Sequence, residues 1–258
     1  MHDYHVHSNY SDGAFLFRMT AAAEEAGLDG VGIADHCMLP VSERQRRSRN
    51  TVGFTLDATH ERRREAIEYL DDGRDIDVYD AVEMDYDPRG EEEIADFLAE
   101  AGFDYAIGSV HSVDDTFVQW NGEFADMDEG ELEAFVDDYY DALVDLVESE
   151  LFAIAAHPDL IERTELLRGR STVDHYRRVA DAIADSRTVP ELNAGRALQD
   201  IGVVHPAEEF LEALLDRDVG VTVGTDAHAP EELGPRAEFL RERVTELGLE
   251  PVSPFDAL

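Results

Sequence analysis

The chain has 258 residues, of which 60 are acidic and 21 basic, and its formal charge at pH 7 is −39. So large a negative charge argues against nucleic acid and against an anionic membrane surface as partners. Every basic residue is an arginine, a composition typical of salt-adapted proteins, so we predict a halophilic protein. The length and the 43% hydrophobic content suffice for one large core, so we expect a single domain over residues 1–258.

Cysteine content and hydropathy bear on the compartment. A single cysteine, Cys37, rules out an intramolecular disulfide and fits a reducing interior. We find no early apolar run of the length of a signal peptide or a membrane span. The sequence therefore predicts a cytoplasmic protein and leaves its oligomeric state open.

Apolar, strand-like runs alternate with helical patterns along the chain. The expected strands cover residues 3–8, 30–35, 78–84, 105–111, 152–157, 188–193 and 219–225. The expected helices cover residues 17–27, 57–73, 91–102, 129–149, 173–185 and 206–217. Seven such units approach the eight that close a (β/α) barrel, so we predict an α/β fold, a distorted seven-stranded (β/α)7 TIM-like barrel. A doubly wound sheet is the alternative.

Histidines and carboxylates gather where the expected strands end. His5 and His7 lie in the first strand with side chains on one face, because side chains alternate along a strand. The carboxyl ends of parallel strands meet at one rim of a barrel, so residues two hundred positions apart can share a pocket. Each of these histidines and carboxylates, taken alone, has a plainer explanation, such as a surface pair, a core histidine, a helix cap or a salt bridge. Together they predict a polynuclear metal site of His5, His7, Asp12, His36, Glu83, His111, His157, Asp226 and His228.

The remaining histidines do not share this placement. His60 and His175 fall inside helical patterns, where we expect surface side chains, and His2 and His205 lie away from the expected strand ends. Cys37 follows His36 directly, but strand alternation turns it the other way, so we expect a buried neighbour rather than a ligand.

Several motifs together resemble the polymerase-and-histidinol-phosphatase (PHP) family, in particular its histidinol-phosphatase branch. They are HVHSNYSDG, ADHC, EMDY, DYAIGSVHSVDD, AHPDLI, ELNAGR and GTDAHAP, and the match as a whole runs from residue 2 to about residue 234. The resemblance implies a seven-stranded barrel, phosphomonoesterase activity and two or three divalent ions, usually among zinc, iron and manganese.

The resemblance also implies how the ligands are shared. One ion would take His5, His7, Glu83 and Asp226, and a second would share Glu83 and take His111 and His157. A third would take Asp12, His36 and His228. Some family members have a cysteine where this chain has His157, and the histidine favours harder ions.

The chemistry of such a site fits phosphate ester hydrolysis. Three divalent ions, three ligand carboxylates and a bridging hydroxide leave a net charge of about +2 to meet a phosphate dianion. Glu83, Asp226 and His228 are accordingly our catalytic candidates. The proton for the departing alkoxide could come from Asp114, Asp159 or a metal-bound water.

The resemblance to the histidinol-phosphatase branch implies L-histidinol phosphate as the substrate, and this is the substrate that we predict. Arg163 and Arg196 follow the fifth and sixth strands and are candidates for binding its phosphate. Glu191 is the candidate for its ammonium group, with a salt bridge to Arg196 as the alternative. Another small phosphate ester, including a nucleotide, is the second possibility, and a non-catalytic metal-binding module is the third.

Four arginines lie in an expected long loop after the second strand. They form either a solvated loop paired with surface acids or a mobile lid over the substrate: Arg44, Arg46, Arg47 and Arg49.

Overall fold

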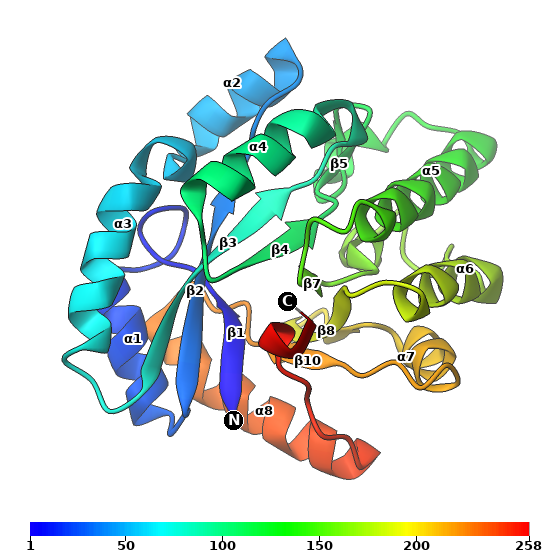
Figure 1. Ribbon diagram of the computed structural model, residues 1–258. Helices are drawn as coiled ribbons and strands as arrows, with labels where there is room; N and C mark the ends of the chain where they lie inside the picture. Colours follow the sequence, from blue (N-terminus) through cyan, green and yellow to red (C-terminus); the bar gives the residue numbers. More distant parts are fainter. Residues whose placement is uncertain (258) are drawn as a thin grey trace.

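The computed structural model describes residues 1–257, and its parallel strands close into a barrel (Figure 1). Val6 at the end of the first strand pairs in parallel with Ala227, beside the last strand, through a hydrogen bond of 2.9 Å from the His7 N–H to the Ala227 carbonyl. The predicted distorted seven-stranded barrel is thus confirmed, and a doubly wound sheet, whose edges stay open, is excluded. Around the barrel the strands are β1 (His2–Val6), β2 (Gly30–Cys37), β3 (Asp77–Asp85), β4 (Tyr105–Ser109), β7 (Ile154–Ala155), β8 (Val189–Arg196) and β10 (Thr222–Gly224).

Helices surround the strands on the outside of the barrel (Figure 1). Their apolar faces pack against buried strand residues, as parallel strands require. Six helices match expected ranges within a few residues: α1 (Leu16–Glu25), α3 (Leu56–Asp71), α4 (Glu91–Ala101), α5 (Glu129–Glu148), α6 (Val173–Ala184) and α7 (Glu208–Leu215). Short 3-10 turns add η1 (Pro88–Gly90), η2 (Asn121–Glu123), η3 (Leu160–Arg163) and η4 (Pro254–Ala257).

The expected long loop after the second strand is wrong, because a helix, α2 (Glu43–Val52), occupies it. Ser42 caps its start by accepting a hydrogen bond from the Gln45 N–H, and Gly53 ends it in the left-handed conformation. Its buried residues are polar, so no apolar period marks the helix in the sequence. The four arginines pair with carboxylates of the chain, Arg44 with Glu123, Arg46 and Arg47 with Glu43, and Arg49 with Asp57.

Other elements were also missed. Helix α8 (Pro230–Leu247) starts at a proline and contains Pro235, which weakens the helical pattern. A hairpin of β5 (Ser112–Val113) and β6 (Thr116–Phe117) follows β4, and β9 (Val203–His205) pairs antiparallel with β8. Cys37 is buried, as expected. None of the helices within residues 1–257 is long and apolar enough to cross a membrane.

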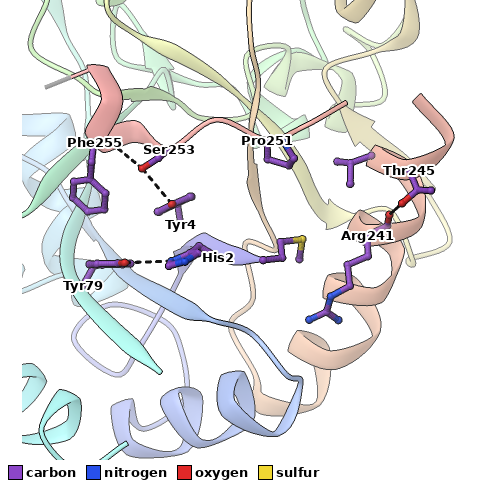
Figure 2. A pocket seen from close by; sticks show the side chains of 10 residues that line it. His2, Tyr4, Tyr79, Arg241, Thr245, Pro251, Ser253 and Phe255 are labelled. Carbon is purple, nitrogen blue, oxygen red and sulfur yellow. Dashed lines mark hydrogen bonds between the residues drawn. The ribbon is translucent and has the colours of Figure 1, made fainter. Parts of the chain in front are cut away.

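A cavity of about 660 Å³ opens at the amino end of the barrel strands (Figure 2). Stacked rings of His2, Tyr4 and Tyr79 form one wall, and Arg241 and Thr245 of α8 lie opposite. The residues predicted to bind metal lie at the other end of the strands. This cavity is therefore not the predicted site, and His2 belongs to it rather than to that site.

Candidate metal centre

The fully buried carboxylate of Glu83 lies at the centre of the predicted ligands. Five of the other eight face it, namely His5, His7, His36, His111 and His157, and the remaining three, Asp12, Asp226 and His228, adjoin them through His7 and His36. Its Oε2 lies 2.8 Å from Nδ1 of His36, 3.4 Å from Nε2 of His5 and 3.5 Å from Nε2 of His7. Although three imidazole nitrogens face it, Oε2 accepts no hydrogen bond from any residue that the structure describes. A buried carboxylate oxygen that lacks a donor but has several ring nitrogens nearby fits a metal ligand, because an ion would fill the missing contacts.

The other oxygen of Glu83 faces the opposite half of the cluster. Oε1 lies 3.0 Å from Nε2 of His157 and 3.5 Å from Nε2 of His111, and it accepts a hydrogen bond from the hydroxyl of Ser109. Glu83 therefore has one oxygen toward each half of the cluster. In this arrangement one carboxylate would be a ligand to two ions if both were bound.

His5 and His7 point to the same face of β1, as predicted. Their Nε2 atoms lie 3.1 Å apart. Zinc binds imidazole nitrogen at about 2.0–2.1 Å, so two ligands of one ion lie about this far apart. The spacing of the pair fits a single ion shared with Glu83.

Asp12 is the centre of a more exposed group. Its Oδ1 lies 3.4 Å from Nε2 of His228 and 3.8 Å from Nε2 of His36. Oδ1 of Asp226 joins this group to the buried one, at 3.5 Å from Nε2 of His7 and 3.6 Å from Nδ1 of His228.

The geometry gives three overlapping ligand groups. They are His7, Asp12, His36 and His228; then His5, His7 and Glu83; and then His36, Glu83 and His111. The group of His5, His7 and Glu83 matches the sharing implied by the family resemblance except that it lacks Asp226, and the group around Asp12 matches it with His7 added. The third has His36 where the resemblance implies His157.

Burial keeps two of the ligands neutral. It lowers the pKa of His7 to about 4, with help from the charges of His228 and His36. Burial likewise lowers the pKa of His157 to about 4. Neutral imidazole is the form that binds metals. Burial opposes ionisation of Glu83, but the charges of its histidine neighbours hold its pKa well below the usual range.

Carboxylates behind the ligands orient two of the rings. Asp85 lies 2.6 Å from Nδ1 of His111, and Glu191 lies 2.8 Å from Nδ1 of His5. Each contact turns the Nε2 of its histidine toward Glu83, an arrangement common around bound metals. A side chain at Gly224 would put its Cβ 1.8 Å from Glu191, so glycine is required for this approach.

The geometry does not support the predicted role of Glu191 at the substrate ammonium group. Its second oxygen accepts hydrogen bonds from the His157 N–H at 3.1 Å and from Asn193 at 2.9 Å. The side chain is 1% exposed, and the alternative salt bridge to Arg196 does not form. Its position inside the barrel makes it a partner of His5 instead.

The two arginines predicted to bind phosphate lie beside the cluster. Nη2 of Arg163, at the end of η3, donates to Asp226 and to Asn193, both at 3.0 Å. The guanidinium of Arg196, at the end of β8, has no hydrogen bond or ion pair with any residue of the described range. Burial and the nearby charge of Arg163 lower the pKa of Arg196.

Two ligands have strained backbones. His157 has a backbone φ of 26° and Asp226 one of 51°, values that residues other than glycine rarely adopt. Strain of this kind concentrates at functional sites, where the surrounding structure holds it. Buried Arg236 stabilises the backbone of Asp226 by donating a hydrogen bond to its carbonyl at 2.8 Å.

One proton donor considered from the sequence is excluded by its contacts. Asp159 is fully buried, and its two oxygens bind Nδ1 of His205 and the N–H of Ala207, each at 2.7 Å. Asp114 lies in the β5–β6 hairpin and lines a hollow with Asp138 that contains no candidate ligand.

The sequence also missed His205. It is fully buried on β9 and contacts Arg163 next to the cluster. Its one signal in the sequence is a lone histidine before a proline, which predicts no site. His60 and His175 lie outside the cluster, as expected, but they are not the surface side chains that we expected. The ring of His60 packs against Phe97 with its Nδ1 buried, and His175, 13% exposed, pairs with Asp137 of α5.

The fold and this cluster define a (β/α) barrel protein with ligands for divalent metal ions at the carboxyl ends of its strands. The model of the PHP domain family matches residues 3–195, and the chain belongs to this family. The resemblance seen in the motifs is thereby confirmed.

Individual relatives agree with this assignment. A protein of Deinococcus radiodurans named "Probable histidinol-phosphatase" is 27% identical over 241 residues, which cover 88% of this chain and 85% of the relative. The crystal structure of histidinol phosphate phosphatase from Lactococcus lactis, complexed with zinc, L-histidinol and phosphate, is 22% identical with a TM-score of 0.74, covering 97% of this chain and 95% of that one. A candidate histidinol phosphatase from Listeria monocytogenes is 16% identical with a TM-score of 0.76, covering 91% and 97%. Both structures share the fold.

Proposed function

We propose that the chain is a metal-dependent phosphomonoesterase that hydrolyses L-histidinol phosphate to L-histidinol and phosphate. The observation that carries the proposal is the cluster of buried Glu83 with eight other candidate ligands facing or adjoining it, beside the unpaired guanidinium of Arg196. The relatives named for histidinol phosphatase, one of them solved with L-histidinol and phosphate, support this substrate.

The proposed cofactors are two or three divalent ions, with zinc, iron or manganese as the candidates. Zinc has the support of the Lactococcus lactis structure, and the many imidazole nitrogens suit any of the three metals. Such ions act as Lewis acids that stabilise the charge developing on the phosphoryl oxygens. Asp226 and His228 link the buried and exposed ligand groups, which is why we keep them with Glu83 as catalytic candidates.

Arg163 and Arg196 are the proposed ligands of the phosphate. Burial and the charge of Arg163 lower the pKa of Arg196, and an anion bound beside both arginines would relieve this repulsion. Guanidinium groups match phosphate oxygens through paired hydrogen bonds. The proposed cellular setting is a cytoplasm of high salt, supported by the single cysteine and the acidic, lysine-free composition.

The proposal is tested by a panel of phosphate monoesters. The protein is stripped of metal, loaded in turn with zinc, manganese or iron(II), and phosphate release is measured from L-histidinol phosphate, nucleoside monophosphates and an aryl phosphate. We expect L-histidinol phosphate to have the highest kcat/KM, Glu83→Gln to abolish turnover, and the exposed control Glu238→Gln to retain it. Phosphate release from nucleotides but not from L-histidinol phosphate would show that the proposed substrate is wrong. Phosphate release from none of the esters would show that the protein is a metal-binding module rather than a phosphatase.

A further inference from the structure

A chain of buried polar contacts connects β9 to the candidate metal ligand Asp226. Oδ1 of Asp159 lies 2.7 Å from Nδ1 of His205, and Nε2 of His205 lies 2.8 Å from Nε of Arg163. Nη2 of Arg163 then lies 3.0 Å from Oδ2 of Asp226. Asp159 and His205 are fully buried, and the side chain of Arg163 is 7% exposed.

The proton positions in this chain follow from the donors available. The Nε of an arginine carries a hydrogen and cannot accept one, so Nε2 of His205 is the acceptor and bears no proton. His205 is therefore neutral, with its hydrogen on Nδ1, and it donates this hydrogen to Asp159. The second oxygen of Asp159 accepts from the N–H of Ala207, which fixes the carboxylate.

This contact determines the orientation of the Arg163 guanidinium. His205 holds its Nε edge, while Asn193 and Asp226 hold Nη2. These contacts leave Nη1 for a ligand. The strand β9 is an addition to the barrel, and its pairing with β8 sets His205 opposite Asn193, beside η3 where Arg163 lies.

We propose that His205 is a positioning residue for phosphate binding, which holds Arg163 so that it braces Asp226 and presents Nη1 to the phosphoryl oxygens. Asp159 acts one step further back by keeping His205 in a single tautomer and orientation. The inference rests on the proposed function insofar as it takes Arg163 to bind the phosphate of the substrate.

Two substitutions separate the two contacts of His205. The amide oxygen of His205→Gln can take the place of Nε2 and keep the contact with Arg163. The shorter His205→Asn reaches the place of Nδ1, so it can keep Asp159 but loses Arg163. Both are polar and of similar size, so a difference between them reports on the Arg163 contact rather than on burial.

The measurement is the binding of inorganic phosphate to the metal-loaded protein by titration calorimetry, with the KM for the aryl phosphate alongside. We expect His205→Asn to weaken phosphate binding at least tenfold and to raise KM more than it lowers kcat, because a charge-assisted hydrogen bond loses its geometry. We expect His205→Gln to stay within about threefold of the wild-type chain. In the background of Arg163→Lys, which lacks the Nε edge, His205→Asn should have no further effect.

Several outcomes would overturn the inference. These are equal phosphate affinity in the wild type and in His205→Asn, equal losses in the two His205 variants, additive losses with Arg163→Lys, or a wild-type protein that does not bind phosphate. A protein that binds phosphate with the expected pattern but hydrolyses no ester would contradict the proposed function and still support the role of His205.

Discussion

Oε1 of Glu191 lies 2.8 Å from Nδ1 of His5, on the side of the ring away from Glu83. The charges of Glu191 and Glu83 raise the pKa of His5 well above its usual value, even though burial lowers it. Glu191 therefore acts on the metal site through His5.

Glu191→Gln tests this relationship. We expect it to lower turnover of L-histidinol phosphate and of an uncharged aryl phosphate by the same factor, because the damage is to an ion site that both substrates use. Losing one charge-assisted hydrogen bond costs about 1.5–3 kcal/mol, which corresponds to at least tenfold weaker metal binding at that site. A loss confined to L-histidinol phosphate would instead return Glu191 to the ammonium group of the substrate.

Arg196→Ala tests the proposed phosphate contact. Because the guanidinium of Arg196 has no partner within the described residues, its removal leaves no buried carboxylate unpaired. We expect the unfolding temperature to stay unchanged while KM rises about tenfold or more for every phosphate ester. The comparison of KM with thermal melting checks this, and an unchanged KM would exclude Arg196 from the substrate site.

Arg63 of α3 is fully buried, and its guanidinium contacts both β2 and β3. Through Asp35 it holds the loop that carries Asp12. It donates to Asp35 at 2.9 Å and to Asp80 at 2.7 Å, and Asp35 accepts from the Ser8 N–H at 2.6 Å. Arg63→Met should lower the free energy of unfolding by about 3–5 kcal/mol, because it removes the arginine that pairs with the buried charge of Asp35, whereas Asp80 keeps its ion pair with Arg64.

The matched control is Arg62→Met, the neighbouring arginine, which is exposed. Urea unfolding of both variants makes the comparison. Equal stabilities would show that the buried pair contributes little.

Repulsion between the acidic side chains should make the stability of the fold depend on salt, and Asp138 of α5 is a place to test it. Burial and the charges of Asp141 and Asp114 raise the pKa of Asp138. A raised pKa means that the folded protein holds this proton more tightly than the unfolded chain. This contribution to stability is therefore present at acid pH and is lost as the pH rises through the raised pKa.

At pH 7 and low salt, Asp138→Asn should therefore raise the melting temperature, and molar salt should remove the difference by screening. The control Glu238→Gln, on α8, lies outside this cluster of acids. Melting temperatures of the wild-type chain that agree between low and molar salt would refute the role of charge repulsion.

The sequence predicted the barrel and its nine candidate ligands because both follow from local patterns. Alternating strands and helices imply parallel strands, and parallel strands bring residues as distant as His5 and Asp226 to one rim. The partners of the ligands were harder to predict. Glu191 on β8 contacts His5 on β1 by passing over Gly224 of β10, the strand between them. No short motif in the sequence reveals this contact.

Elements outside the regular alternation were missed for related reasons. His205 lies on a three-residue strand that pairs with β8 alone. Its proposed role is visible only from its contact with Arg163, which the sequence does not show. Helix α2 has an almost wholly polar sequence whose buried positions are Gln45 and Ser48, so hydropathy gives no helical period there.

The metal content of the purified protein tests the central claim most directly. Elemental analysis after metal-replete preparation and gel filtration should give two to three divalent ions per chain for the wild type. Glu83→Gln should lose more metal than any other single ligand variant, because its two oxygens face both halves of the cluster. Fewer than one ion per wild-type chain would contradict the account.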